Sequence, residues 1–151
     1  MLRHTIATLA YRAAKVLRGA PAEFGEYRAS DTSRTAVQIL AHMGDLFDWA
    51  LALAEGRQVW REAAPMSWDA EVNRFFEVLS RFDEFVSSGS PVFAEDRLFQ
   101  GPIADALTHV GQLAMLRRMA GWPVRGENYY KADITVGRVG REQSAPAREF
   151  D

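Results

Sequence analysis

Three polar residues interrupt apolar helical stripes in this 151-residue chain. His42 lies among apolar residues that recur every three or four positions, and Asp105 and His109 do the same in a later segment. A charged aspartate in a core is costly unless it is paired with another charge or bound to a metal ion. These residue types therefore indicate either a metal site or a buried ion pair.

The spacing of the three residues suits metal binding. Asp105 and His109 are four residues apart, which places both side chains on one face of a helix. Helical bundles assemble metal sites from two such ligands and a third on a facing helix, here His42. Two imidazoles and a carboxylate leave coordination positions open for water or substrate. Because ligation needs neutral imidazoles, affinity should fall below about pH 6.5.

The plainer interpretation of the same residues stays open. His42 could be a core histidine with one hydrogen-bond partner, and Asp105 with His109 could be an ion pair without metal, since this spacing arises readily by chance. The remaining histidine, His4, is expected in solvent. Asp45 is expected either to orient His42 or to lie on a solvated edge.

The segments that carry these residues are predicted to be helices. Gly, Pro and Ser clusters separate four helical patterns, with Ser33 and Ser67 as candidate N-caps and Pro102 in the first turn of the last helix. Ile134–Val136 is the one short strand candidate. The sequence predicts an all-α, four-helix bundle as a single domain over residues 1–151, with helices at about 2–17, 34–55, 68–87 and 102–120 and a short irregular C-terminal tail at 121–151.

The helical faces predict how the bundle packs. The third helix has a clear apolar stripe, and Glu71 and Arg74 are expected on its solvent face. The second and fourth helices are apolar on two faces, so Met115 and Met119 are expected in packed positions. A second subunit or the tail could cover the extra faces, and we expect a homodimer. Arg117 and Arg118 are expected to be surface or interface cations near a helix C-terminus. The stretch from Arg125 to Tyr130 could line a pocket rim or form a solvated turn.

Composition narrows the class of protein. Lys and Arg total 18 against 20 Asp and Glu, so no electrostatic argument favours nucleic acid or a membrane surface as partner. The absence of Cys excludes disulfides, thiolate metal sites and cysteine nucleophiles. No apolar run is long enough to span a bilayer, and charges interrupt any secretory signal, so we expect a cytoplasmic protein. No phosphate-binding loop, dinucleotide fingerprint or hydrolase motif is present, and no catalytic residue can be assigned.

Two short motifs resemble a known family. The segment Ile39–Met43, with the sequence ILAHM, is similar to the signature in the second helix of the DinB/YfiT-like metalloenzymes. The segment Thr108–Leu113, with the sequence THVGQL, resembles the H-x-G-Q-L segment of that family's last helix. The order of the motifs, the helix lengths and the total size also fit, so the resemblance covers about residues 2–121.

The resemblance implies a four-helix bundle, often dimeric, in which three histidines bind a divalent metal. His42 and His109 match two of them, whereas Asp105 stands where the family has its third histidine. A carboxylate can ligate zinc or nickel, which we expect first, and also manganese or iron. Family members with known activity handle a low-molecular-weight thiol, so the resemblance implies a metal-dependent transferase or isomerase for a small molecule. The alternative is a catalytically silent, dimeric helical bundle that binds or regulates.

Overall fold

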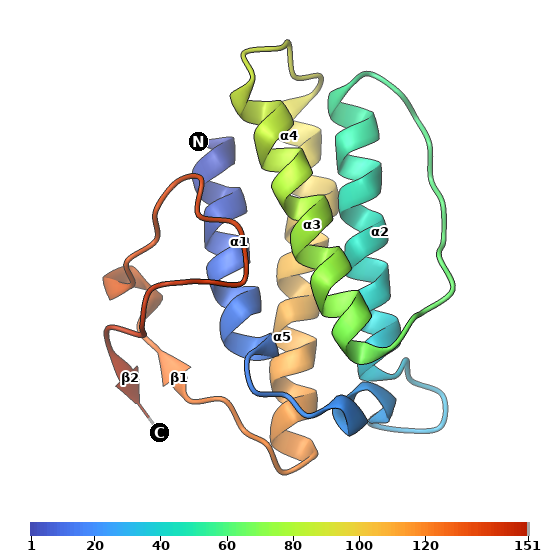
Figure 1. The fold of residues 1–151 in the computed structure, drawn as a ribbon, viewed down its shortest axis with the longest axis vertical. Coiled ribbons are helices and arrows are strands. Elements are labelled where there is room, and N and C mark those ends of the chain that lie inside the picture. The colour runs from blue at the N-terminus through green and yellow to red at the C-terminus, as the bar shows by residue number, and fades with distance from the viewer. Residues whose placement is uncertain (151) are drawn as a thin grey trace.

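Four long helical rods make up the protein, as the computed structural model of residues 1–150 shows (Figure 1). They are α1 (Leu2–Leu17), α2 (Ala36–Ala54), α3 (Trp68–Ser87) and a last rod that contains α4 (Glu95–Leu98) and α5 (Ala104–Met119). The predicted all-α bundle with an irregular C-terminal tail is confirmed.

The helix boundaries follow local capping chemistry. α1 and α3 have the predicted limits, and the apolar stripe of α3 is buried except for half-buried Val86. α2 begins later than expected because Thr35, and not Ser33, is its N-cap. The Thr35 hydroxyl accepts a hydrogen bond from the Gln38 amide, and the Gln38 side chain accepts one from the Thr35 amide. Ser67 precedes α3 but makes no side-chain cap.

The last rod begins earlier than predicted. It starts at Glu95 and passes through a π-helical turn, Phe99–Ile103, before α5. Pro102 therefore lies inside the rod and not at its start. Because proline has no amide hydrogen, it cannot donate to the carbonyl four residues earlier, and the wider turn accommodates it.

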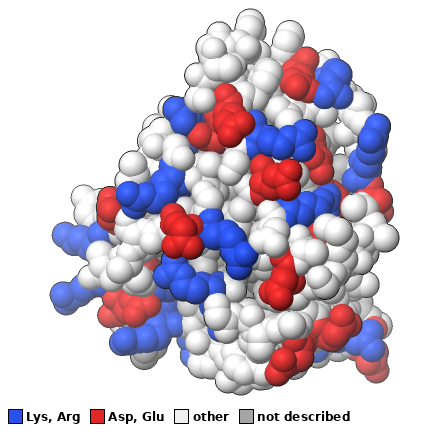
Figure 2. Space-filling view, in the orientation of Figure 1, with Lys and Arg blue, Asp and Glu red and all other residues white. Residues whose placement is uncertain are grey.

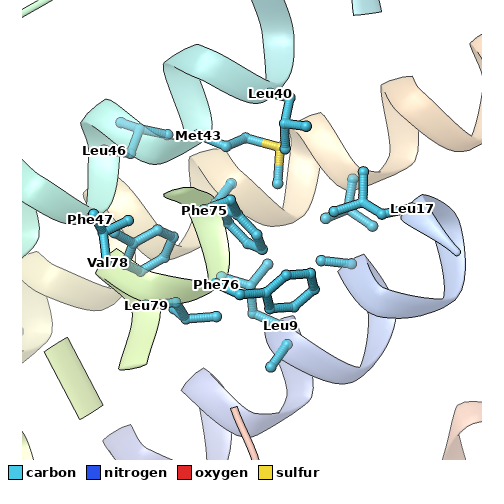
Figure 3. Close-up of a cluster of buried hydrophobic side chains, with 14 of the residues drawn as sticks. Leu9, Leu17, Leu40, Met43, Leu46, Phe47, Phe75, Phe76, Val78 and Leu79 are labelled. Carbon is cyan, nitrogen blue, oxygen red and sulfur yellow. The ribbon is translucent and has the colours of Figure 1, made fainter. Parts of the chain in front are cut away.

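The helices α1 and α2 form one diagonal pair of the bundle, and α3 and α5 form the other; each helix packs on both helices of the other pair. α2 contacts α3 and α5, and α1 contacts the same two helices from the opposite side. The core between them holds aromatic and aliphatic side chains from α1, α2 and α3 (Figure 3). Among the fully buried ones are Leu9, Leu40, Met43, Phe47, Phe75 and Leu79. This packing fixes the facing sides of α2 and α5, which carry His42 and His109.

The second apolar faces of α2 and α5 have different surroundings. Along α2 runs the exposed segment 55–67, which passes down the outside of the bundle (Figure 1). On α5, Met115 and Met119 are 58% and 52% exposed, so they do not pack in the core of a single chain. The homodimer stays a prediction.

The tail packs mainly beside α1. It contains a two-stranded antiparallel ribbon, β1 (Gly126–Glu127) with β2 (Glu149–Phe150), and one 3₁₀ turn at Tyr129–Lys131. Ile134–Val136 is not a strand, which corrects the prediction. Glu127 is buried and accepts a hydrogen bond from the Tyr11 hydroxyl, whereas Tyr130 is 91% exposed in the 3₁₀ turn. The predicted solvated turn therefore holds for only part of this stretch.

Arg117 is a buried residue, contrary to the prediction of a surface cation. Its guanidinium donates to the carbonyls of Val16, Arg18 and Trp122, and burial lowers its pKa. It therefore ties the C-terminal end of α1 to α5 and the start of the tail. Arg118, one residue later, is exposed as predicted.

Charges of both signs are intermixed over the visible face of the molecule (Figure 2). Within residues 1–150, no helix combines the length and apolarity that crossing a membrane requires.

Candidate metal centre

His42, Asp105 and His109 converge between α2 and α5, as the sequence predicted. The His42 Nε2 atom lies 3.4 Å from Asp105 Oδ2, and the His109 Nε2 atom lies 3.4 Å from Asp105 Oδ1. The two imidazole rings are nearly perpendicular, with centroids 5.0 Å apart. One ligand atom from each residue falls within 4.8 Å of the other two.

These separations fit a shared cation. Ligands held at about 2.0–2.1 Å around a tetrahedral ion lie roughly 3.4 Å from one another. Direct charge-assisted hydrogen bonds between imidazole and carboxylate would be shorter, at about 2.7–2.9 Å. Both contacts of Asp105 therefore have the length expected for two ligands of one ion, and the donor set matches zinc, nickel, manganese or iron.

Gln112 fixes the orientation of the His109 ring. Its Oε1 atom accepts a hydrogen bond from the Nδ1 atom of His109 over 2.8 Å. An amide oxygen can only accept, so the proton of a neutral ring lies on Nδ1 and the lone pair of Nε2 faces Asp105. A lone pair and a carboxylate repel each other unless a cation lies between them. Such outer partners are characteristic of histidine ligands.

Asp105 is more exposed than its helical pattern predicted. Its side chain is 46% exposed, whereas those of His42 and His109 are 17% and 11% exposed. The centre thus lies at the edge of the α2–α5 interface, and not inside the core. An ion held there would be reachable from solvent through the Asp105 side.

Aromatic residues border His42. The indole of Trp60, from segment 55–67, lies edge to face with the His42 ring at a centroid distance of 5.8 Å. Trp60 also contacts Trp49 of α2 in the same way. The segment therefore covers part of the centre on its α2 side. The tail makes its contacts elsewhere, with α1 through Glu127 and with Asn73 of α3.

Asp45 does not orient His42 and is not on a solvated edge, so both predictions for it are wrong. It is buried, forms a close ion pair with Arg74 of α3, and accepts a hydrogen bond from the Ala63 amide. Asp45 therefore holds segment 55–67 against the bundle.

Arg74 belongs to a partly buried charge cluster that the helical pattern did not predict. Its guanidinium contacts Asp45, Asp48 and fully buried Glu71, so the predicted solvent face of α3 is wrong for Glu71. Burial opposes the charge of Arg74, but the hydrogen bond and the attraction of Asp45 outweigh it and raise the pKa. The available signal was the run of acidic residues on α2 opposite a basic residue on α3.

The third histidine takes no part in the centre. His4 is exposed on α1, as predicted.

No protein family, curated protein or solved structure matches the chain. The resemblance to DinB/YfiT-like proteins therefore stays a prediction.

Proposed function

We propose that the protein is a divalent-metal-dependent enzyme of the DinB/YfiT-like type, acting on a small molecule with an external thiol or with water. The observation that carries the proposal is the placement of two imidazole nitrogens at 3.4 Å from the two oxygens of one carboxylate. A divalent ion there would lower the pKa of a coordinated thiol or water and so supply a nucleophile near neutral pH.

The chain's own residues have distinct tasks in this proposal. His42, Asp105 and His109 supply the ligand atoms, and Gln112 holds the His109 ring with its Nε2 atom available. Trp60 packs against the His42 ring, while half-exposed Asp105 marks the open side. Because the chain has no Cys, any thiol in the reaction must come from a second small molecule.

Elemental analysis of protein purified without a metal-affinity tag tests the proposal. The expected result is close to one transition-metal ion per chain, or uptake of one zinc or nickel ion by metal-free protein. Protein that is isolated without metal and takes up neither ion would overturn the proposal. That outcome would favour a catalytically silent bundle in which Asp105 pairs with the histidines alone.

A further inference from the structure

A hollow opens directly beside the candidate metal centre, on its His109 side. It has a volume of about 440 Å³, which lies in the range of small-molecule sites, and His109 and Gln112 form part of its wall. A second, smaller hollow of about 170 Å³ lies on the His42 side. Arg34 is among the residues that line both hollows.

The lining of the larger hollow is mostly apolar. Buried Ile39 and Leu116 form part of its wall, and exposed Met115 and Met119 lie beside them. Methionine side chains are flexible and polarisable, and they adapt to ligands of varied shape. We call this surface the α5 groove, defined by Arg34, Ile39, Met115, Leu116 and Met119.

One positive charge lines the α5 groove. Among the described residues that line it, Arg34 alone carries a formal charge. Within residues 1–150 it has no acidic partner, and the nearby Asp31 pairs with Arg28. An unpaired guanidinium beside an apolar wall complements a ligand with an anionic group and an aliphatic body.

We propose that the α5 groove binds the substrate of the metal centre, and that this substrate is a small carboxylate with an aliphatic body. The carboxylate contacts Arg34, and the body lies over Met115 and Leu116 beside His109. That the bound carboxylate is a substrate rests on the proposed function. Binding of the carboxylate in the α5 groove does not depend on that function.

Calorimetric titration of metal-free protein with octanoate and with 1-octanol tests the groove. The two probes share a tail, so their difference reports the carboxylate. We expect octanoate to bind about tenfold more tightly than 1-octanol, because one charge-assisted contact is gained. Arg34→Gln should remove this advantage and leave 1-octanol unchanged. Arg118→Gln is the matched control, an exposed arginine of α5 outside the groove, and should bind both probes normally.

Met115→Gln should weaken both probes to a similar extent, because it replaces the thioether with a polar amide of similar size. Equal octanoate binding by Arg34→Gln and by the parent would overturn the proposal. So would octanoate binding that requires added zinc and ignores Arg34, because the carboxylate would then contact the ion. If Met115→Gln instead converts a dimer to a monomer in light scattering, a second copy covers the groove and the proposal fails.

The metal measurement separates this proposal from the proposed function. Uptake of one zinc ion without Arg34-dependent octanoate binding would support the metal centre and overturn the proposal for the groove. Octanoate binding through Arg34 without metal uptake would support the groove and overturn the proposed enzyme function.

Discussion

Gln112 holds the ring of His109 through a 2.8 Å hydrogen bond to its Nδ1 atom, one helical turn away on α5. This bond decides which ring nitrogen faces Asp105, and therefore whether the centre presents a lone pair to a cation. We expect Gln112→Leu to weaken zinc binding about tenfold without loss of helicity. Gln112→Glu should restore affinity because a carboxylate accepts the same proton. Competition with a chromophoric chelator measures both, and unchanged affinity in Gln112→Leu would contradict the role.

Asp105 is the residue on which metal binding should depend most. Asp105→Ala is expected to weaken zinc binding by at least about 100-fold, since two ligands hold a divalent ion far less tightly than three. Asp105→His should retain or improve zinc affinity, because it restores the three-histidine pattern that the family resemblance implies. Asp96→Ala, which removes an exposed carboxylate from α4, is the control and should bind normally. Parental affinity in Asp105→Ala would reduce Asp105 to an ion-pair partner.

Segment 55–67 should loosen when Asp45 is removed. Asp45→Ala takes away a close partner of partly buried Arg74 and the acceptor of the Ala63 amide, and we expect the free energy of unfolding to fall by about 3 kcal/mol. Trypsin should then cleave faster after Arg57 or Arg61. Asp48→Ala, which removes a half-exposed partner of the same arginine, should have a much smaller effect on both measurements. Equal protease resistance of the two variants would show that Asp45 does not hold the segment.

Arg117 should contribute far more to the free energy of unfolding than Arg118 does. Arg117→Met leaves the carbonyls of Val16, Arg18 and Trp122 without their donor, and we expect a loss of about 3 kcal/mol. Thermal unfolding should then occur about 10 °C lower. Arg118→Met should shift the midpoint little, because Arg118 is exposed. Similar midpoints for the two variants would rule out the tie between α1 and α5.

The tail should detach in acid. Lys15 donates a hydrogen bond to Glu149, and this bond lowers the pKa of the Glu149 carboxyl from its ordinary value of 4.5. A lowered pKa in the folded state means that the ion pair stabilises the tail above pH 4.5, and that this contribution is lost as the pH falls through the lowered value. The Asn128 amide donates a hydrogen bond to the Arg148 carbonyl, and its hydrogen exchange should accelerate as the pH falls through the lowered pKa of Glu149. In Glu149→Gln this acid-dependent step should be absent, and an unchanged step would assign it elsewhere.

Periodicity predicted the bundle, and burial in α3 follows a single stripe. The Gly, Pro and Ser residues between the patterns predicted the ends of α1 and α3. Periodicity also predicted that His42, Asp105 and His109 lie close together. Helical spacing places Asp105 and His109 on one face, and His42 was expected on the facing helix. It could not place buried polar residues. Glu71 was assigned to solvent by its charge, yet Arg74 compensates for its burial, and such pairing depends on which helices are neighbours.

The sequence also could not predict which apolar residues are exposed. Met115 and Met119 are apolar residues typical of a core, but they lie on a face of α5 that neither α1 nor α2 covers. The early start of the last rod was hidden because Pro102 is typical of a first turn and rare inside a helix. Only the structure shows the π-helical turn that accommodates it.

That turn also sets a rotational offset. The extra residue between Leu98 and Ala104 shifts the phase of everything after it by about 100° relative to an uninterrupted α-helix. With this offset, Leu98 lies in the core while Asp105 reaches the two histidines. Deleting Gly101 alone would force a choice between them, because one half of the rod must turn away from its partners. A single-residue deletion about one turn before Asp105 would then either disassemble the centre or expose a buried leucine.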